Sequence, residues 1–169
     1  MGEILRPLER TGERDSGSRN LSIQYVASDA DKIKAAKDTT ILSSIQLNGT
    51  LHYTTFLGGT TVERFKQYLE SDLLPHLDGN SVLIMDNMKS HHAKAVKNLL
   101  DSSGIRYIYL PPYSPDLNPI EKLWSKVKAF LRKFKARTLD TLPNAVQRAF
   151  QTVSPSDCSG WFKSCDYLH

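Results

Sequence analysis

Cysteine is scarce in this sequence, which has only Cys158 and Cys165 among its 169 residues. Their spacing matches no metal-binding or redox motif, so we expect two reduced thiols in a reducing compartment. No apolar run approaches the roughly 18 residues that span a membrane, and no signal peptide is recognisable, which predicts a cytoplasmic protein without a membrane partner. A glycine-rich phosphate-binding loop is also missing, which weighs against a small-molecule phosphotransferase.

The middle of the sequence predicts a strand–helix–strand unit. The apolar run Ser81–Met85 is typical of a buried strand, and Asp86 ends it. A helix from Ala93 to Leu100, closed by Gly104, and a strand from Ile105 to Leu110 come next. A right-handed crossover of this kind sets the two strands parallel, so their carboxyl ends share one edge of the sheet. Ligands bind at that edge in open α/β sheets.

A second acid is predicted to reach the same edge. Glu121 begins a helix 35 positions after Asp86, behind a loop stiffened by three prolines. Carboxylate oxygens are hard ligands, so the pair favours Mg²⁺ or Mn²⁺. A purely structural alternative exists, because Asn118, Pro119 and Glu121 also have the outline of a helix N-cap with a capping box.

Secondary structure elsewhere is predicted from turn and capping signals. Asn48-Gly49 is a strong hairpin signal, expected to join strands over Thr40–Leu47 and Thr50–Phe56. Thr60 and Glu63 have the spacing of a capping box for a helix over Thr61–Leu74. Two further helices are expected near the end of the chain, one over Pro143–Val153 and a short one starting within Ser154–Asp157.

Positive charge is concentrated in the helix predicted over Ile120–Arg137. This segment has seven basic residues against Glu121 alone, a net charge of +6, so the rest of the +4 chain sums to −2. Its apolar residues, Trp124 among them, recur at helical spacing and are expected to pack on the sheet. Duplex DNA carries one phosphate charge about every 1.7 Å of its axis, so the basic face can contact several phosphates. A solvated lysine-rich surface is the alternative. The residues expected to contact DNA are Lys122, Lys126, Lys128, Arg132 and Lys133.

Four features together resemble one known family. They are the Asp86-Asn87 pair, His91 five residues after Asp86, the gap of 34 residues before Glu121, and the string Pro-Pro-Tyr-Ser-Pro-Asp-Leu-Asn-Pro-Ile-Glu that ends at Glu121. The combination resembles the DDE transposases, specifically the mariner-type superfamily and related bacterial insertion-sequence transposases, from Thr39 to the C-terminus. The resemblance implies an α/β, ribonuclease-H-like fold. Such a fold has a mixed sheet, an antiparallel meander followed by parallel strands, and helices on both faces.

The same resemblance implies metal-dependent cleavage and strand transfer of DNA by three carboxylates and two divalent ions. Asp86 is then expected to be the second carboxylate and Glu121 the third, both catalytic. Asn87 and His91 are expected to support the metal site by hydrogen bonding. Tyr113 and Asn118 are expected to contact DNA, and the assembly is expected to be a homodimer.

The first carboxylate of that family is missing from its expected place. Asp29 follows the run Leu21–Ala27, which alternates well enough to be a strand, but it lies only 57 positions before Asp86, which is short for the family. It is the remaining candidate for the third metal ligand. We expect residues 1–38 to be an irregular or remnant segment and residues 39–169 to form a catalytic domain without a clear first strand. A chain that begins just after the true first acid would need an upstream reading-frame product to supply that acid and a helix-turn-helix module.

Two other functions agree with the same residues. A non-catalytic DNA-binding or dimerising remnant of such a transposase would keep the fold and the basic helix, and it predicts salt-dependent DNA affinity without metal-dependent nicking. An unrelated α/β metal-dependent phosphotransferase would use Asp86 at the strand end, and it predicts activity on small phosphoesters.

Overall fold

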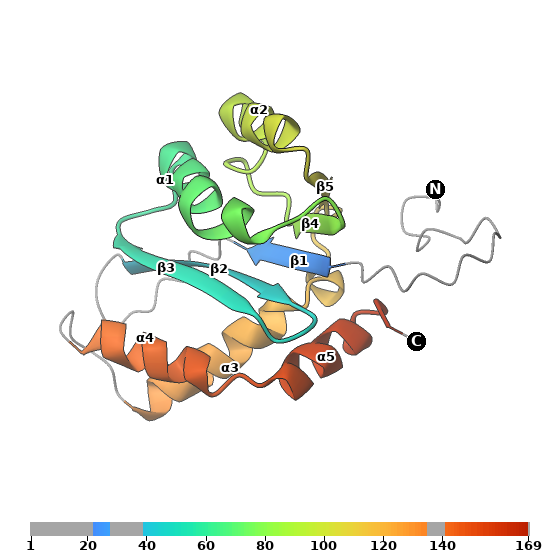
Figure 1. Ribbon diagram of the computed structural model, residues 1–169. Helices are drawn as coiled ribbons and strands as arrows, with labels where there is room; N and C mark the ends of the chain where they lie inside the picture. Colours follow the sequence, from blue (N-terminus) through green and yellow to red (C-terminus); the bar gives the residue numbers. More distant parts are fainter. Residues whose placement is uncertain (1–21, 28–38, 135–140, 169) are drawn as a thin grey trace.

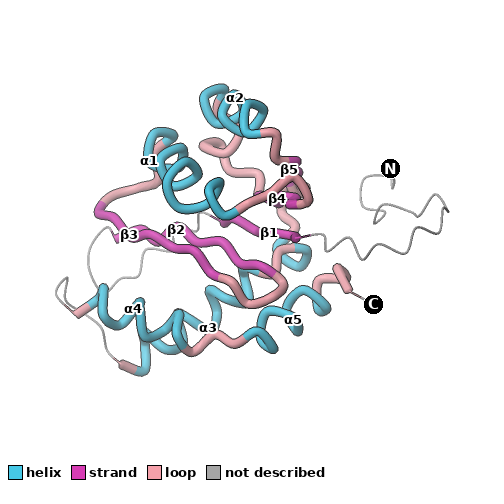
Figure 2. The backbone as a smooth tube through the Cα atoms, in the orientation of Figure 1, coloured by secondary structure: helices cyan, strands magenta, loops and turns pink. Residues whose placement is uncertain are grey.

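A five-stranded mixed sheet forms the centre of the computed structural model, which describes residues 22–27, 39–134 and 141–168 (Figures 1 and 2). The strand order is β3-β2-β1-β4-β5. The pairs β1–β2 and β2–β3 are antiparallel, whereas β1–β4 and β4–β5 are parallel. An antiparallel meander followed by parallel strands was expected and is confirmed. The strands are β1 (Ser22–Ala27), β2 (Thr39–Gln46), β3 (Leu51–Leu57), β4 (Ser81–Met85) and β5 (Arg106–Tyr109).

Helices cover both faces of this sheet, as expected (Figure 1). One face carries α1 (Val62–Tyr68) and α2 (Lys94–Ser103), and the other carries α3 (Ile120–Lys133), α4 (Leu142–Gln151) and α5 (Pro155–Ser164). Two hydrophobic cores result, one on each face of the sheet. Side chains of β2 alternate between them, and every residue of β2 is buried because helices cover both of its faces.

The strand β1 lies outside the domain boundary that the sequence predicted. A domain starting at residue 39 was expected to lack a clear first strand, but Ser22–Ala27 pairs with both β2 and β4 in the middle of the sheet. Alternation of apolar and polar residues in Leu21–Ala27 indicates a strand, but it does not show that this strand belongs to the sheet of the domain. The neighbouring strands β2 and β4 supply the hydrogen-bonding partners that place this segment in the middle of the sheet.

The β2–β3 hairpin turns at Asn48-Gly49, as predicted. The amide of Gln46 donates to the carbonyl oxygen of Thr50 at 2.9 Å, and the amide of Thr50 donates to the side chain of Asn48 at 2.9 Å. Gly49 has φ +91°, and a Cβ there would lie 2.8 Å from the Cα of Pro155. The turn therefore requires glycine both for its conformation and for its close approach to the start of α5.

Both boundaries of the helix predicted over Thr61–Leu74 differ from the structure. Thr61, not Thr60, caps α1, accepting a hydrogen bond from the amide of Arg64 at 3.2 Å. The helix predicted through Leu74 is α-helical only to Tyr68, continuing as a π-helical turn over Leu69–Leu73 and a short 3₁₀ turn. Within the described ranges no helix has the length and apolar character needed to cross a bilayer.

Candidate active site

Asp86 lies where the chain leaves β4 at the carboxyl edge of the parallel strands. The amide of Leu110 donates to the carbonyl oxygen of Met85 at 2.7 Å, so β4 and the end of the β5 segment reach this edge together. The Asp86 side chain is 29% exposed. One of its oxygens, Oδ1, accepts a hydrogen bond from the amide of Met88 at 3.2 Å. The carboxylate is therefore held by the loop that follows it while still reaching the surface.

His91 fixes this carboxylate from the interior. Its Nδ1 lies 2.7 Å from Oδ1 of Asp86 and 3.2 Å from the backbone oxygen of the same residue. Both of these atoms are acceptors, so Nδ1 carries the proton. The imidazole is fully buried and stacks on Phe65 of α1, with ring centroids 4.1 Å apart. Its Nε2 is buried without a hydrogen-bond partner among the described residues. The ring has little freedom, so the orientation of Asp86 is fixed in advance.

Asn87 contacts a different histidine. Its side-chain oxygen lies against Nε2 of His92, and the His92 ring stacks on Tyr109 with centroids 4.0 Å apart. The Tyr109 hydroxyl donates to the carbonyl oxygen of His91 at 2.7 Å. Burial raises the pKa of Tyr109 to about 12, so it remains a donor at neutral pH. Asn87 therefore belongs to a surface cluster that supports the loop after Asp86.

Glu121 lies in the first turn of α3, and the capping box that was its structural alternative is not formed with a side-chain N-cap. Pro119 occupies the N-cap position, and no side chain caps the helix. The amide of Glu121 donates to the carbonyl oxygen of Asn118 at 3.1 Å. Ile120 is fully buried in the core that also contains Ile84 of β4 and Leu110. The start of α3 is thereby packed into the core on this face of the sheet, and no side-chain cap supports the capping alternative for Glu121.

The proline loop before α3 presents one aromatic side chain to solvent. Tyr113 is fully exposed and has φ +57°, a left-handed conformation that is costly for a residue with a bulky side chain. Asn118 is only 3% exposed, and its Oδ1 has no hydrogen-bond partner within the described part of the chain. Of the two loop residues expected to contact DNA, only Tyr113 is on the surface.

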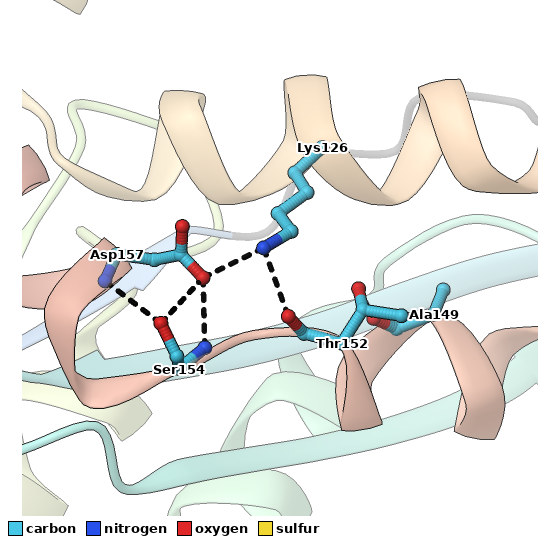
Figure 3. A network of polar contacts seen from close by, with 5 residues as sticks. All are labelled: Lys126, Ala149, Thr152, Ser154 and Asp157. Atoms are coloured by element: carbon cyan, nitrogen blue, oxygen red, sulfur yellow. Dashed lines mark hydrogen bonds and ion pairs between the residues drawn. The ribbon is translucent and has the colours of Figure 1, made fainter.

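Lys126 is bound within the protein, as Figure 3 shows. Its Nζ lies 2.6 Å from Oδ2 of Asp157 and 2.8 Å from the carbonyl oxygen of Thr152. The same Oδ2 accepts a hydrogen bond from the amide of Ser154, which caps α5 in a capping box. The hydrogen bond from Lys126 is the main reason that the pKa of Asp157 is lowered. Lys126 thus joins α3 to the start of α5.

The other basic residues of α3 lie toward solvent and its apolar residues pack on the sheet, as the sequence predicted. Five residues of α3, including Trp124, are buried against the sheet. Lys122, Arg132 and Lys133 are exposed, and Lys128 is half-buried.

The residues present fit a divalent ion only in part. Asp86 and Glu121 carry the hard oxygen ligands that Mg²⁺ takes, and Mg²⁺ is often held by one or two carboxylates with water and substrate phosphates. Within residues 22–27, 39–134 and 141–168, however, no three His, Cys, Asp or Glu side chains form a metal-binding group. Asp29 lies outside the described residues. Asp86 and Glu121 thus have the right ligand chemistry, but without a third ligand in the described ranges they fall short of a ligand set for two ions.

Two residues of this site are not apparent from the sequence alone. Phe65 stacks on His91 from an adjacent helix, and Tyr109 holds the backbone of the loop after Asp86. The apolar periodicity of α1 marks Phe65 as inward-facing, but nothing local shows which residue it meets.

Comparison with known proteins agrees with this architecture. The family model described as a DDE superfamily endonuclease matches residues 22–143. The Tc1 transposase of Caenorhabditis elegans is 29% identical and the Tcb2 transposase of Caenorhabditis briggsae 31% identical, each over 75 residues. Each match covers 44% of this chain and 28% of the relative, so the chain spans less than a third of the curated relatives.

Solved structures share the fold at low sequence identity. The catalytic domain of Mos1 mariner transposase is 17% identical, with a TM-score of 0.72 over 86% of this chain and 77% of that chain. The same catalytic domain with raltegravir and Mg is 15% identical, with a TM-score of 0.69 over 86% of this chain and 78% of the other. The catalytic core of BIV integrase is 15% identical, with a TM-score of 0.59 over 86% of this chain and 98% of that chain.

Proposed function

This chain belongs to the DDE superfamily endonuclease family, of the mariner-like transposase type, and we propose from this membership that it is a catalytic domain that cleaves and joins DNA strands with a divalent metal ion. Asp86 and Glu121 are the proposed metal-binding and catalytic residues. The observation that carries the proposal is the contact between Asp86 and the buried His91. A partly exposed carboxylate held by a buried ring beside the carboxyl edge of parallel strands is suited to ligand binding.

Mg²⁺ or Mn²⁺ is the proposed metal. One neighbouring Mos1 structure contains Mg and two contain Mn, and the carboxylates of Asp86 and Glu121 provide ligands of the matching chemistry. A bound ion of this type would neutralise charge on the phosphate oxygens of the substrate. The contribution of the chain itself is positional, because His91 and the amide of Met88 hold Asp86, and the buried Ile120 anchors the helix turn that carries Glu121.

DNA is the proposed partner, contacted by the exposed part of α3 and by Tyr113. Lys122, Arg132 and Lys133 provide positive charge along the solvent side of this helix. These contacts would go to phosphates and therefore position the DNA without reading its sequence. Lys126 is left out of this surface because its amine is bound to Asp157 and Thr152.

Manganese binding and plasmid nicking test this function together. We expect the chain to bind Mn²⁺ in isothermal titration calorimetry and to nick supercoiled DNA in its presence, with Asp86→Asn and Glu121→Gln each removing both activities. Asp116→Asn is the matched control, because Asp116 is an exposed acid of the same loop region and is expected to leave both unchanged. Equal Mn²⁺ binding by Asp86→Asn and the unaltered chain would overturn the metal site. DNA binding without any Mn²⁺-dependent nicking would favour the non-catalytic alternative instead.

A further inference from the structure

The loop before Glu121 is held by a residue that follows α5. The Tyr167 hydroxyl donates a hydrogen bond to the carbonyl oxygen of Leu117 at 2.9 Å, although the two residues are 50 positions apart in the sequence. The amide of Asn118, which belongs to the same peptide unit, donates to the carbonyl oxygen of Pro115 at 3.0 Å. This peptide unit is therefore fixed on both of its sides.

The same peptide unit leads directly into the first turn of α3. The carbonyl oxygen of Asn118 accepts a hydrogen bond from the amide of Glu121 at 3.1 Å, and no side chain caps the helix. A rotation of the peptide unit between Leu117 and Asn118 would displace the residue whose carbonyl receives that amide. The position of Glu121 therefore depends on how firmly this unit is held.

Tyr167 is itself anchored to the body of the protein. Its amide donates to the carbonyl oxygen of Phe162 in α5 at 3.1 Å, a backbone contact that does not depend on the side chain at position 162. The Tyr167 side chain packs against the core that also contains Ile120, the first residue of α3. The hydroxyl thus connects the loop to a part of the chain with its own fixed position.

Charge effects on a neighbouring thiol agree with this placement. Cys165 is buried in the turn that ends α5, and burial raises the pKa of its thiol. The charges of Lys122 and Asp116 also act on this pKa. Lys122 belongs to α3 and Asp116 to the proline loop, so the turn after α5 lies close to both segments that meet at Glu121.

We infer that Tyr167 is a positioning residue of the metal site, whose hydroxyl holds the Leu117 carbonyl, fixes the turn that carries Glu121 and thereby strengthens metal binding. The inference rests on the proposed function, since it takes Glu121 as a metal ligand. A ligand that is already in position loses less conformational freedom when the ion binds. Removing the hydroxyl should therefore weaken metal binding without removing any ligand atom.

The substitution Tyr167→Phe tests the inference on the full chain, because phenylalanine keeps the ring and lacks only the donor. We expect the Mn²⁺ affinity in isothermal titration calorimetry to fall about tenfold, which is typical when a group that supports a metal ligand is lost. The unfolding temperature should fall by about 2–4 °C. Tyr167→Met, with an apolar side chain of adaptable shape and no donor, is the variant to use if Tyr167→Phe does not fold.

Tyr68→Phe is the matched control. The Tyr68 hydroxyl donates to the carbonyl oxygen of His52 at 3.1 Å, and Tyr68 lies in the core on the opposite face of the sheet. This variant also loses a tyrosine hydroxyl that binds a backbone carbonyl. It should lose at least as much thermal stability and keep its Mn²⁺ affinity, which separates positioning of the site from a general loss of stability.

Amide hydrogen exchange, followed by NMR without metal, shows where the hydroxyl acts. In Tyr167→Phe the amides of Asn118 and Glu121 should exchange at least about threefold faster, because the peptide unit that precedes them is released. The amide of Met88, which donates to Asp86, should exchange as it does in the unaltered chain.

Three results would overturn the inference. The first is an unchanged Mn²⁺ affinity in folded Tyr167→Phe, or in Tyr167→Met in its place. The second is an equal loss of affinity in Tyr68→Phe, and the third is unchanged exchange of the Glu121 amide. Failure of the proposed function looks different, since Asp86→Asn would then bind Mn²⁺ as the unaltered chain does. Faster exchange of the Glu121 amide would still show in that case that the hydroxyl holds the loop.

Discussion

The orientation of Asp86 depends on side chains that do not belong to its own loop. His91 is clamped between Asp86 and the ring of Phe65, and it is fully buried. A ring in this position cannot turn without opening the core between the sheet and α1. At the residue scale, the precision of the site is therefore a property of the packing behind it.

Replacement of Phe65 by leucine should separate packing from metal binding. Phe65→Leu keeps an apolar side chain but removes the stacked ring, so we expect a loss of about 1 kcal/mol in unfolding free energy and weaker Mn²⁺ binding as His91 gains freedom. Phe162→Leu is the matched control, because Phe162 is equally buried in the core on the other face of the sheet. It should lose similar stability and keep its Mn²⁺ affinity. Equal Mn²⁺ affinities for both variants would contradict this explanation.

The lowered pKa of His52 predicts how the stability of the protein depends on pH. Burial and the stacked ring of His76 lower the pKa of His52, outweighing the nearby carboxylate of Asp72. The folded protein then binds this proton more weakly than the unfolded chain does. Stability from this group is therefore complete above the unfolded pKa of about 6.5 and decreases as the pH falls below it. Urea unfolding at pH 7 and pH 5 should show a smaller decrease in His52→Gln than in the unaltered chain. An unchanged decrease would exclude His52 as its cause.

At the scale of elements, α3 combines two tasks that its sequence does not distinguish. Lys126 and Lys133 are both lysines of one basic helix, but among the described residues only Lys126 has an ion-pair partner, Asp157, and a carbonyl partner, Thr152. That pair of contacts connects α3 to the helix cap of α5 (Figure 3). One side of the helix thus secures the fold, and exposed positions are left for a ligand.

Two methionine substitutions on α3 should affect different properties, one the stability of the protein and the other its affinity for DNA. Lys126→Met removes the contact with Asp157, so we expect a loss on the order of 1 kcal/mol in unfolding free energy and little change in DNA affinity. Lys133→Met removes an exposed charge, so we expect unchanged stability, weaker DNA binding and a smaller dependence of that binding on salt. Fluorescence anisotropy over a salt series and urea unfolding measure the two quantities. Stronger loss of DNA affinity in Lys126→Met would contradict this division.

Local signals were sufficient for some elements and not for others. The strand Ser81–Met85 was predicted with its observed ends, because a polar residue bounds the apolar run on each side. Gly104, with φ +71°, ends α2 as predicted. Two adjacent threonines can each cap α1, and only the structure shows that Thr61 does so. The alternation of Leu21–Ala27 was sufficient to indicate a strand, but no local pattern contains its central place between β2 and β4.

In the candidate site, too, some residues could be predicted from the sequence and others could not. Asp86 and Glu121 were singled out because one ends a buried strand and the other begins a helix, and His91 because its spacing from Asp86 resembles a family. The contact of His91 with Asp86 is now seen in the structure. The partner of Lys126 is 31 residues away in the chain, and Phe65 comes from another helix, so neither contact has a sequence signature. Tertiary contacts decide which of the similar side chains are available for binding.

The whole molecule is held together by strands that two cores share. Leu42 and Ile45 are both completely buried in β2, but they point into opposite cores, Leu42 toward α1 and α2 and Ile45 toward α3, α4 and α5. Loosening either core exposes one side of the same strand. The two helical layers should therefore lose their structure together rather than one after the other.

Tryptophan fluorescence allows this coupling to be measured, because Trp124 and Trp161 both pack in the core that contains Ile45. Leu42→Ala creates a cavity on the opposite face and should cost about 2–5 kcal/mol. If the layers unfold together, this variant shifts the urea midpoint of the tryptophan signal as far as that of the far-UV circular dichroism. Ile45→Ala should do the same from the near side. A tryptophan midpoint that stays in place in Leu42→Ala would show instead that α3, α4 and α5 keep their core after the opposite layer has unfolded.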